Sequence, residues 1–176
     1  MLYRFGARGV LVEANPMLVA ELERERKGDV ILNKCVAEKS GEYVDFYIMN
    51  GDGLSTLDYS QAMECIEKNP ALNIEQVVKM ETISLPDLLE KFFREPPMLV
   101  NIDVEGNELE LLRDLGLEQK KPLIIIVETI PYDPSIKVNR KNEEIIAYME
   151  SMGYIEYAFT GINSIFVDAK RLSEEE

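Results

Sequence analysis

The chain contains no histidine, so it lacks the side chain that proteins most often use as a general base and as a metal ligand. Catalytic sets of serine, histidine and aspartate, or of cysteine and histidine, are thereby excluded in their usual forms. The two cysteines, Cys35 and Cys65, do not form a metal-binding pattern. We therefore expect no metal centre, a buried Cys35 within its apolar run, and the reducing environment of the cytoplasm.

Long apolar runs and phosphate-binding glycine motifs are also missing. The longest apolar run, residues 122–127, has the length of a strand and falls well short of the roughly 18–20 residues that cross a membrane. No basic region followed by an apolar stretch opens the sequence, which predicts no signal peptide. Neither GxxxxGK[ST] nor GxGxxG occurs, so no phosphate cradle is visible.

Positive charge is scarce, with 19 basic against 33 acidic residues and a net charge of −14. Nucleic-acid binding depends on clustered Lys and Arg, so we expect no nucleic-acid partner. A small molecule with a neutral or positive reacting group suits this charge better. The alternative is that the acidity serves solubility alone.

What the sequence does contain is the pattern of one α/β domain over residues 1–176, of which 46% are apolar. Residues 10–13, 16–27 and 30–36 read as strand, helix and strand, the unit of a parallel sheet. Residues 41–83 form a predicted insertion with antiparallel strands at 43–49 and 76–83. Further parallel strands are expected at 98–104 and 123–128, and an antiparallel hairpin at 154–167 closes the chain. The predicted sheet is therefore mostly parallel.

Carboxylates stand at the ends of three of these predicted parallel strands, namely Glu13, Asp103 with Glu105, and Glu128. Ligands of open α/β sheets bind just beyond the carboxyl ends of the strands, where carboxylates can accept hydrogen bonds from hydroxyls. One alternative is that these residues only cap the helices that follow. A second is that Asp103 and Glu105 hold Mg²⁺, although no third ligand is evident.

Ser55 and Thr56 follow the glycine-containing turn at residues 50–53 and form a second candidate site. Their hydroxyls could reach a bound substrate from the insertion. The alternative is a local turn in which the hydroxyls bond the backbone.

Taken in order, these segments resemble the FkbM family of S-adenosylmethionine-dependent methyltransferases. The resemblance covers nearly the whole chain and rests on Gly9–Pro16, on Ile31-Leu32-Asn33 with Val36, on Ser55-Thr56-Leu57, on Ile102–Gly106 with Glu108 and Leu111-Leu112, and on Val127-Glu128. It implies a Rossmann-like class I methyltransferase fold. It also implies S-adenosylmethionine as the cofactor and, chiefly, O-methylation of small molecules or sugars.

The resemblance also implies roles for individual residues. Glu13 would bind the ribose hydroxyls of the cofactor, with Asn15 beside the same edge, and residues around Cys35 and Val36 would line the adenine. The cofactor's methionine portion or the acceptor would face Asp103 and Glu105.

A hydroxyl acceptor would benefit from a base, and with no histidine present either a carboxylate must serve or water must carry the proton. Asp103 is the predicted base, with Glu105 and Glu128 as alternatives. Glu128, Ser55 and Thr56 are the predicted acceptor-side residues.

The family's first strand and its glycine loop would precede Tyr3, which leads us to expect an N-terminally truncated domain. A second copy of the chain, in a homo-oligomer, is one way to fill the gap. Two further hypotheses stay open at this point. One is a catalytically inactive, truncated binding module, and the other is a different nucleotide-binding enzyme such as a dehydrogenase.

Overall fold

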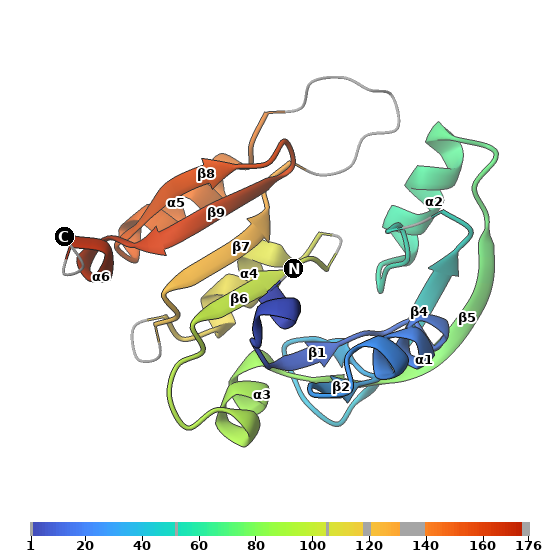
Figure 1. Ribbon diagram of the computed structural model, residues 1–176. Helices are drawn as coiled ribbons and strands as arrows, with labels where there is room; N and C mark the ends of the chain where they lie inside the picture. The colour runs from blue at the N-terminus through green and yellow to red at the C-terminus, as the bar shows by residue number, and fades with distance from the viewer. Residues whose placement is uncertain (1, 52, 105, 118–120, 131–139, 174–176) are drawn as a thin grey trace. The chain divides into compact units, whose positions relative to one another are not determined.

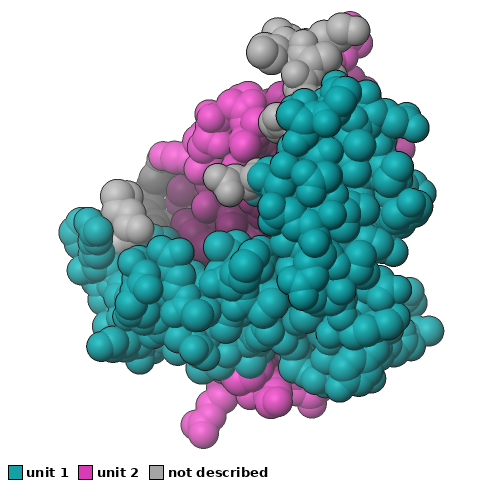
Figure 2. All heavy atoms as spheres, turned by 90° about the vertical axis from the view of Figure 1, so that its right-hand side faces the viewer, with its two compact units in different colours: residues 1–87 teal, residues 88–176 magenta. Residues whose placement is uncertain are grey.

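The computed structural model describes residues 2–51, 53–104, 106–117, 121–130 and 140–173. The chain divides into two compact units, residues 1–87 and residues 88–176 (Figure 2). The expectation of a single domain stays a prediction.

The first sheet of unit 1 is the predicted strand–helix–strand unit. A short 3-10 helix, η1 (Leu2–Phe5), precedes strand β1 (Val10–Val12), helix α1 (Pro16–Glu25) and strand β2 (Val30–Leu32). Strands β1 and β2 run parallel (Figure 1), with Val12 opposite Leu32. The carboxyl ends of both strands therefore lie at the same edge.

The second sheet of unit 1 has the order β3–β5–β4, formed by β3 (Cys35–Val36), β5 (Ile74–Ile83) and β4 (Tyr43–Met49). Strands β4 and β5 are antiparallel, as predicted for the insertion, whereas the end of β5 pairs with β3 in parallel. Helix α2 (Tyr59–Lys68) lies between β4 and β5 in the chain.

The strand expected over residues 30–36 is interrupted at residues 33 and 34. Its first part pairs with β1 and its second part with β5, so the chain changes partner between them. The side chain of Asn33 bonds backbone carbonyls at this point, which competes with continuation of the strand.

Unit 2 contains one four-stranded sheet with the order β6–β7–β9–β8. Its strands are β6 (Leu99–Ile102), β7 (Ile124–Glu128), β8 (Tyr154–Phe159) and β9 (Asn163–Asp168). Only β6 and β7 are parallel, and β8 and β9 form the predicted antiparallel hairpin. Helix α3 (Leu85–Phe92) crosses the boundary between the units, and α4 (Glu108–Asp114), α5 (Glu143–Ser151) and α6 (Ala169–Ser173) belong to unit 2.

The core of unit 2 lies on one face of this sheet. Ile125, Val127 and Phe166 are fully buried, whereas Ile124 and Ile126, which alternate with them, are half-buried. Successive residues of a strand point to opposite faces, so the two faces differ in cover. Helix α5 packs on β8 and also contacts α4.

The sheets are mixed rather than mostly parallel as predicted. The described strands form three parallel and three antiparallel pairings. The antiparallel share comes from the β4–β5 pairing within the insertion, the β8–β9 hairpin and the β7–β9 pairing. No helix within the described ranges is long and apolar enough to cross a membrane.

Candidate functional site

Glu13 lies directly beyond the carboxyl end of β1, as the sequence predicts. Its backbone N–H donates to the Leu32 carbonyl at 3.0 Å, which extends the β1–β2 ladder by one step. Its carboxylate Oε1 accepts the N–H of Asn15 at 2.6 Å. The second oxygen, Oε2, has no hydrogen-bond partner among the described residues, so it is free to accept a bond from a ligand hydroxyl.

Asn15 is the N-cap of α1, and its Oδ1 accepts the N–H of Met17 at 3.0 Å. Pro16 occupies the first turn of the helix, where the absence of an N–H costs nothing. The predicted neighbours Glu13 and Asn15 therefore share one turn. The carboxylate of the first fixes the backbone of the second.

Cys35 begins β3 and is 2% exposed, which confirms that it is buried. It packs in a cluster with Phe46, Ile48 and Met80, and Ala14 of the Glu13 turn packs against the same cluster. Burial, together with the negative charge of Glu13, raises the pKa of the Cys35 thiol to about 11. Glu13 and Cys35 thus lie close enough to interact electrostatically, while the thiol itself faces the core.

The adenine contacts predicted for Cys35 and Val36 stay a prediction. Because the Cys35 side chain is enclosed in the core, only its backbone and the half-buried Val36 remain to form such a contact.

Ser55 and Thr56 bond within the insertion. The Ser55 hydroxyl accepts the N–H of Met49 at 3.1 Å. Thr56 is 3% exposed, donates from its hydroxyl to Gln61 at 2.7 Å, and pairs its backbone with Tyr47. These are the bonds of the local-turn alternative, and a substrate role for either residue stays a prediction.

Asp103 and Glu128 lie at one edge of the unit 2 sheet. Ile102, the last residue of β6, is opposite Val127 of β7; Asp103 directly follows Ile102, and Glu128 follows Val127 as the last residue of β7. Adjacent strands are about 4.8 Å apart, so the two carboxylates belong to neighbouring positions. Asp103 is exposed and Glu128 half-buried, opposite Asn163 of β9. Glu105 lies outside the described residues, so its predicted role is not placed.

Glu108 is a buried carboxylate at this edge to which the sequence reasoning gave no role. It is 8% exposed at the start of α4, and its Oε1 accepts the N–H of Gly106 at 2.9 Å. Gly106 has a φ of 115°, a conformation that favours glycine. Glu108 therefore fixes the turn that follows Asp103. An acidic residue two positions after a glycine, at the start of a leucine-rich helix, was the available sequence signal.

A buried polar chain adjoins Glu128 in unit 2. Thr129 and Ser164 are almost fully buried, and their hydroxyls lie 2.8 Å apart. The Ser164 hydroxyl donates to Glu156 at 2.6 Å, and Lys141 pairs with the same carboxylate. Burial opposes ionisation of Glu156, but these hydrogen bonds and the charge of Lys141 lower its pKa below the usual value. This series of hydrogen bonds links the β8–β9 hairpin to Thr129, the residue after Glu128.

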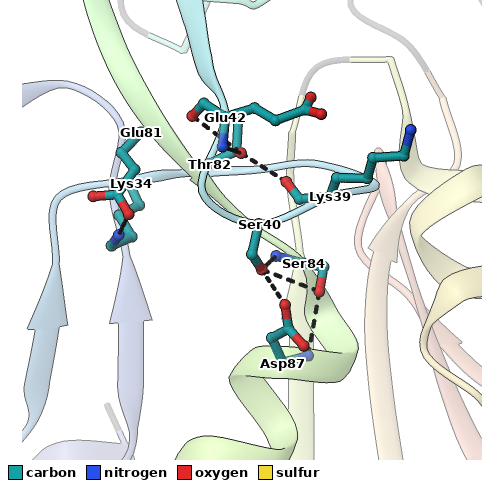
Figure 3. Close-up of polar contacts among 8 residues, drawn as sticks. All are labelled: Lys34, Lys39, Ser40, Glu42, Glu81, Thr82, Ser84 and Asp87. Carbon is teal, nitrogen blue, oxygen red and sulfur yellow. Dashed lines mark hydrogen bonds and ion pairs between the residues drawn. The ribbon is translucent and has the colours of Figure 1, made fainter.

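Ser40, Ser84 and Asp87 form a further cluster in unit 1 (Figure 3). The Ser84 hydroxyl accepts the N–H of Asp87 at 3.3 Å, as an N-cap side chain does, at the start of α3. The Ser40 hydroxyl accepts the N–H of Ser84 at 2.8 Å and donates to the Asp87 carboxylate. Hydrogen bonds from the two serines hold the pKa of Asp87 below its usual value. The cluster anchors the loop after β3 to the start of α3.

Acidic side chains and cysteines do not gather into a metal site in the described part of the chain, where no group of three or more could hold an ion. The resemblance implies that Glu13 of unit 1 and Asp103 of unit 2 contact the same cofactor molecule. This stays a prediction.

The chain is an α/β protein with carboxylates at or just beyond the carboxyl ends of its parallel strands. Proteins of this class bind small molecules at that edge of the sheet. The family model described as a methyltransferase FkbM domain matches residues 1–156, and the chain belongs to this methyltransferase family. The resemblance drawn from the sequence is thereby confirmed. No curated protein and no solved structure matches the chain.

Proposed function

We propose that the chain transfers a methyl group from S-adenosylmethionine to a hydroxyl group of a small molecule or sugar, on a Rossmann-like class I fold. The family match carries this proposal, because a methyltransferase requires a methyl donor. Neither Cys35 nor Cys65 is part of a disulfide, which supports the cytoplasm as its location. The expected partner is a small-molecule acceptor, and a homo-oligomer remains part of the proposal.

The turn after β1 fits the cofactor chemically. Glu13 holds one carboxylate oxygen on the Asn15 N–H and leaves the other without a partner among the described residues, as a ribose hydroxyl requires. Val36 and the backbone of Cys35 would contact the adenine, with Asn15 beside the ribose edge. S-adenosylmethionine supplies a methyl group already activated by the positive charge of its sulfur.

The residues of unit 2 would then handle the acceptor. Asp103 is exposed and has no hydrogen-bond partner among the described residues, so its carboxylate is available to take the acceptor's hydroxyl proton. Glu128, at the end of the neighbouring strand β7, would orient the acceptor. Ser55 and Thr56 of unit 1 stay candidate acceptor contacts. Glu105 is the alternative base. The main contribution of the protein is alignment of the two reactants, since the leaving group needs little help.

Methyl transfer from labelled S-adenosylmethionine to a panel of sugars and small hydroxyl compounds tests the proposal. We expect Asp103→Asn to lower turnover by about a hundredfold or more, the range of general-base catalysis. Glu110→Gln is the matched control, because Glu110 is exposed on α4 and its ion pair with the exposed Arg113 spans 3.5 Å. Unchanged turnover in Asp103→Asn would remove that residue from the mechanism.

Calorimetric titration of the wild type separates the alternatives. Submillimolar binding of S-adenosylmethionine supports the methyltransferase, and absent binding supports the inactive binding module. Binding of NAD in place of S-adenosylmethionine would support a dehydrogenase.

A further inference from the structure

We propose that Asn33 is a positioning residue that clamps the Glu13 turn and thereby presents the Glu13 carboxylate to the cofactor. This inference rests on the proposed function of Glu13. It concerns a residue that would act through Glu13.

Asn33 directly follows β2, at the point where the chain stops pairing with β1 and, from Cys35 on, pairs with β5. Leu32 is the last residue of β2 and accepts the N–H of Glu13 at 3.0 Å. The next strand, β3, begins at Cys35 and pairs with β5. The regular ladder between β1 and β2 therefore stops at this step, and another contact must hold the turn after β1.

The Asn33 side chain supplies that contact. Its amide nitrogen Nδ2 donates to the Glu13 carbonyl at 2.9 Å and to the Ala14 carbonyl at 3.1 Å. A side-chain amide has two N–H donors, so one group can satisfy two successive carbonyls. Aspartate has the same shape but no donor when ionised, and it would face both carbonyl oxygens with negative charge.

Fixing these two carbonyls restrains the two peptide groups on either side of Ala14, Glu13–Ala14 and Ala14–Asn15. The carboxylate of Glu13 is itself held by the N–H of Asn15, the next residue in the turn. The cap bond from Met17 to Asn15 continues this order into α1. The orientation of the Glu13 oxygen without a partner thus depends on a turn fixed at three points, one of which is Asn33.

The exposure of Asn33 distinguishes a positioning role from a purely structural one. Its side chain is exposed and belongs to neither of the two apolar clusters described for this unit. Removing its amide leaves no cavity in those clusters. We therefore expect ligand binding to suffer more than stability.

Asn50 offers a matched control in the same unit. Its amide donates to the Ala71 carbonyl at 3.0 Å, and its oxygen accepts the N–H of Asn73 at 2.9 Å. It too is an exposed asparagine that fixes loop backbone, but its partners lie in the insertion.

The experiment compares Asn33→Ala and Asn50→Ala in the full chain, by calorimetric titration with S-adenosylhomocysteine. We expect Asn33→Ala to raise Kd about tenfold, in line with the loss of two neutral hydrogen bonds, and Asn50→Ala to leave Kd unchanged. In a Glu13→Gln background the effect of Asn33→Ala should shrink to about twofold or less, because the residue acts through Glu13.

Three results would overturn the inference: an unchanged Kd in Asn33→Ala, an equal loss in Asn50→Ala, or an undiminished effect in the Glu13→Gln background. If the wild type binds no S-adenosylhomocysteine, the proposed function fails, and amide hydrogen exchange then tests the clamp separately. The Asn15 N–H should exchange at least about tenfold faster in Asn33→Ala than in Asn50→Ala if the clamp orders the turn. Equal exchange would refute the clamp.

Discussion

Replacing Glu13 with glutamine should weaken binding of S-adenosylmethionine without unfolding the protein. Glutamine keeps an oxygen that can accept the N–H of Asn15, now bonded to Glu13 at 2.6 Å. It removes the negative charge and puts an NH₂ group where Oε2 faces no protein partner among the described residues. The change is therefore confined to what the carboxylate offers a ligand.

The expected loss of binding free energy follows from the two hydrogen bonds that the hydroxyls of a ribose can donate to the Glu13 carboxylate. Hydrogen bonds to a charged group contribute about 1.5–3 kcal/mol, against about 0.5–1.5 kcal/mol for neutral pairs. The loss is then about 1–1.5 kcal/mol for each bond, or about 2–3 kcal/mol for two. At about 1.4 kcal/mol for each factor of ten, Kd should rise by about 30- to 150-fold.

Isothermal titration calorimetry measures this change, and urea unfolding checks that the free energy of unfolding shifts by less than about 1 kcal/mol. Glu21→Gln is the control, since Glu21 is an exposed residue of α1 whose ion pair with Arg24 spans 3.6 Å. A Kd for Glu13→Gln within about threefold of wild type, or an equal loss in Glu21→Gln, would refute the assignment of Glu13 to the ribose.

Ile125→Ala should lower the free energy of unfolding by about 2–5 kcal/mol, because the Ile125 side chain is fully buried. Ile126→Ala should lower it by clearly less, because Ile126 is half-buried. Equal losses in urea unfolding would contradict the difference in burial between the two faces of the sheet. Asn142→Ala should cost about 1 kcal/mol through loss of the α5 cap, whereas Asn142→Gly should cost only a few tenths, and the same urea unfolding would show it. Iodoacetamide at pH 8 should modify the half-buried Cys65 and spare Cys35, as mass spectrometry of the digest would show. Since folding raises the pKa of Cys35 from 9.0 to about 11, its neutral thiol favours the folded state below pH 9. That contribution should disappear as the pH rises to about 11, and a Cys35→Ala chain should lack this alkaline loss.

Much of the local structure was predictable because local rules govern it. Asn15 and Asn142 are of a residue type that favours helix N-caps, and both accept the backbone N–H groups that a helix start leaves unpaired. Helix α4 begins at Glu108, after the Gly106 turn that the Glu108 carboxylate fixes. The family was also predictable, since it rests on an ordered set of residues.

Part of the site was not predictable from the sequence. The roles of Asn33, Glu108 and the pair Ser40–Asp87 depend on contacts across 19 to 47 positions, or on a turn whose geometry only folding defines. Polar residues of these types are common in loops, and nothing in their spacing marks which carbonyl or amide they meet.

The sequence by itself determined most of the strands and helices, the carboxylates at the ends of the parallel strands, and the family to which the chain belongs. Periodicity, caps and ordered motifs are local properties, which is why they could be read without the fold. Only the tertiary structure decided that the second strand breaks at Asn33, that the sheets are mixed, and that the Glu13 turn is bonded from β2. Strand partners and side-chain hydrogen bonds between distant residues depend on which backbones meet. The Glu13 carboxylate was thus placed by the sequence and oriented by the fold.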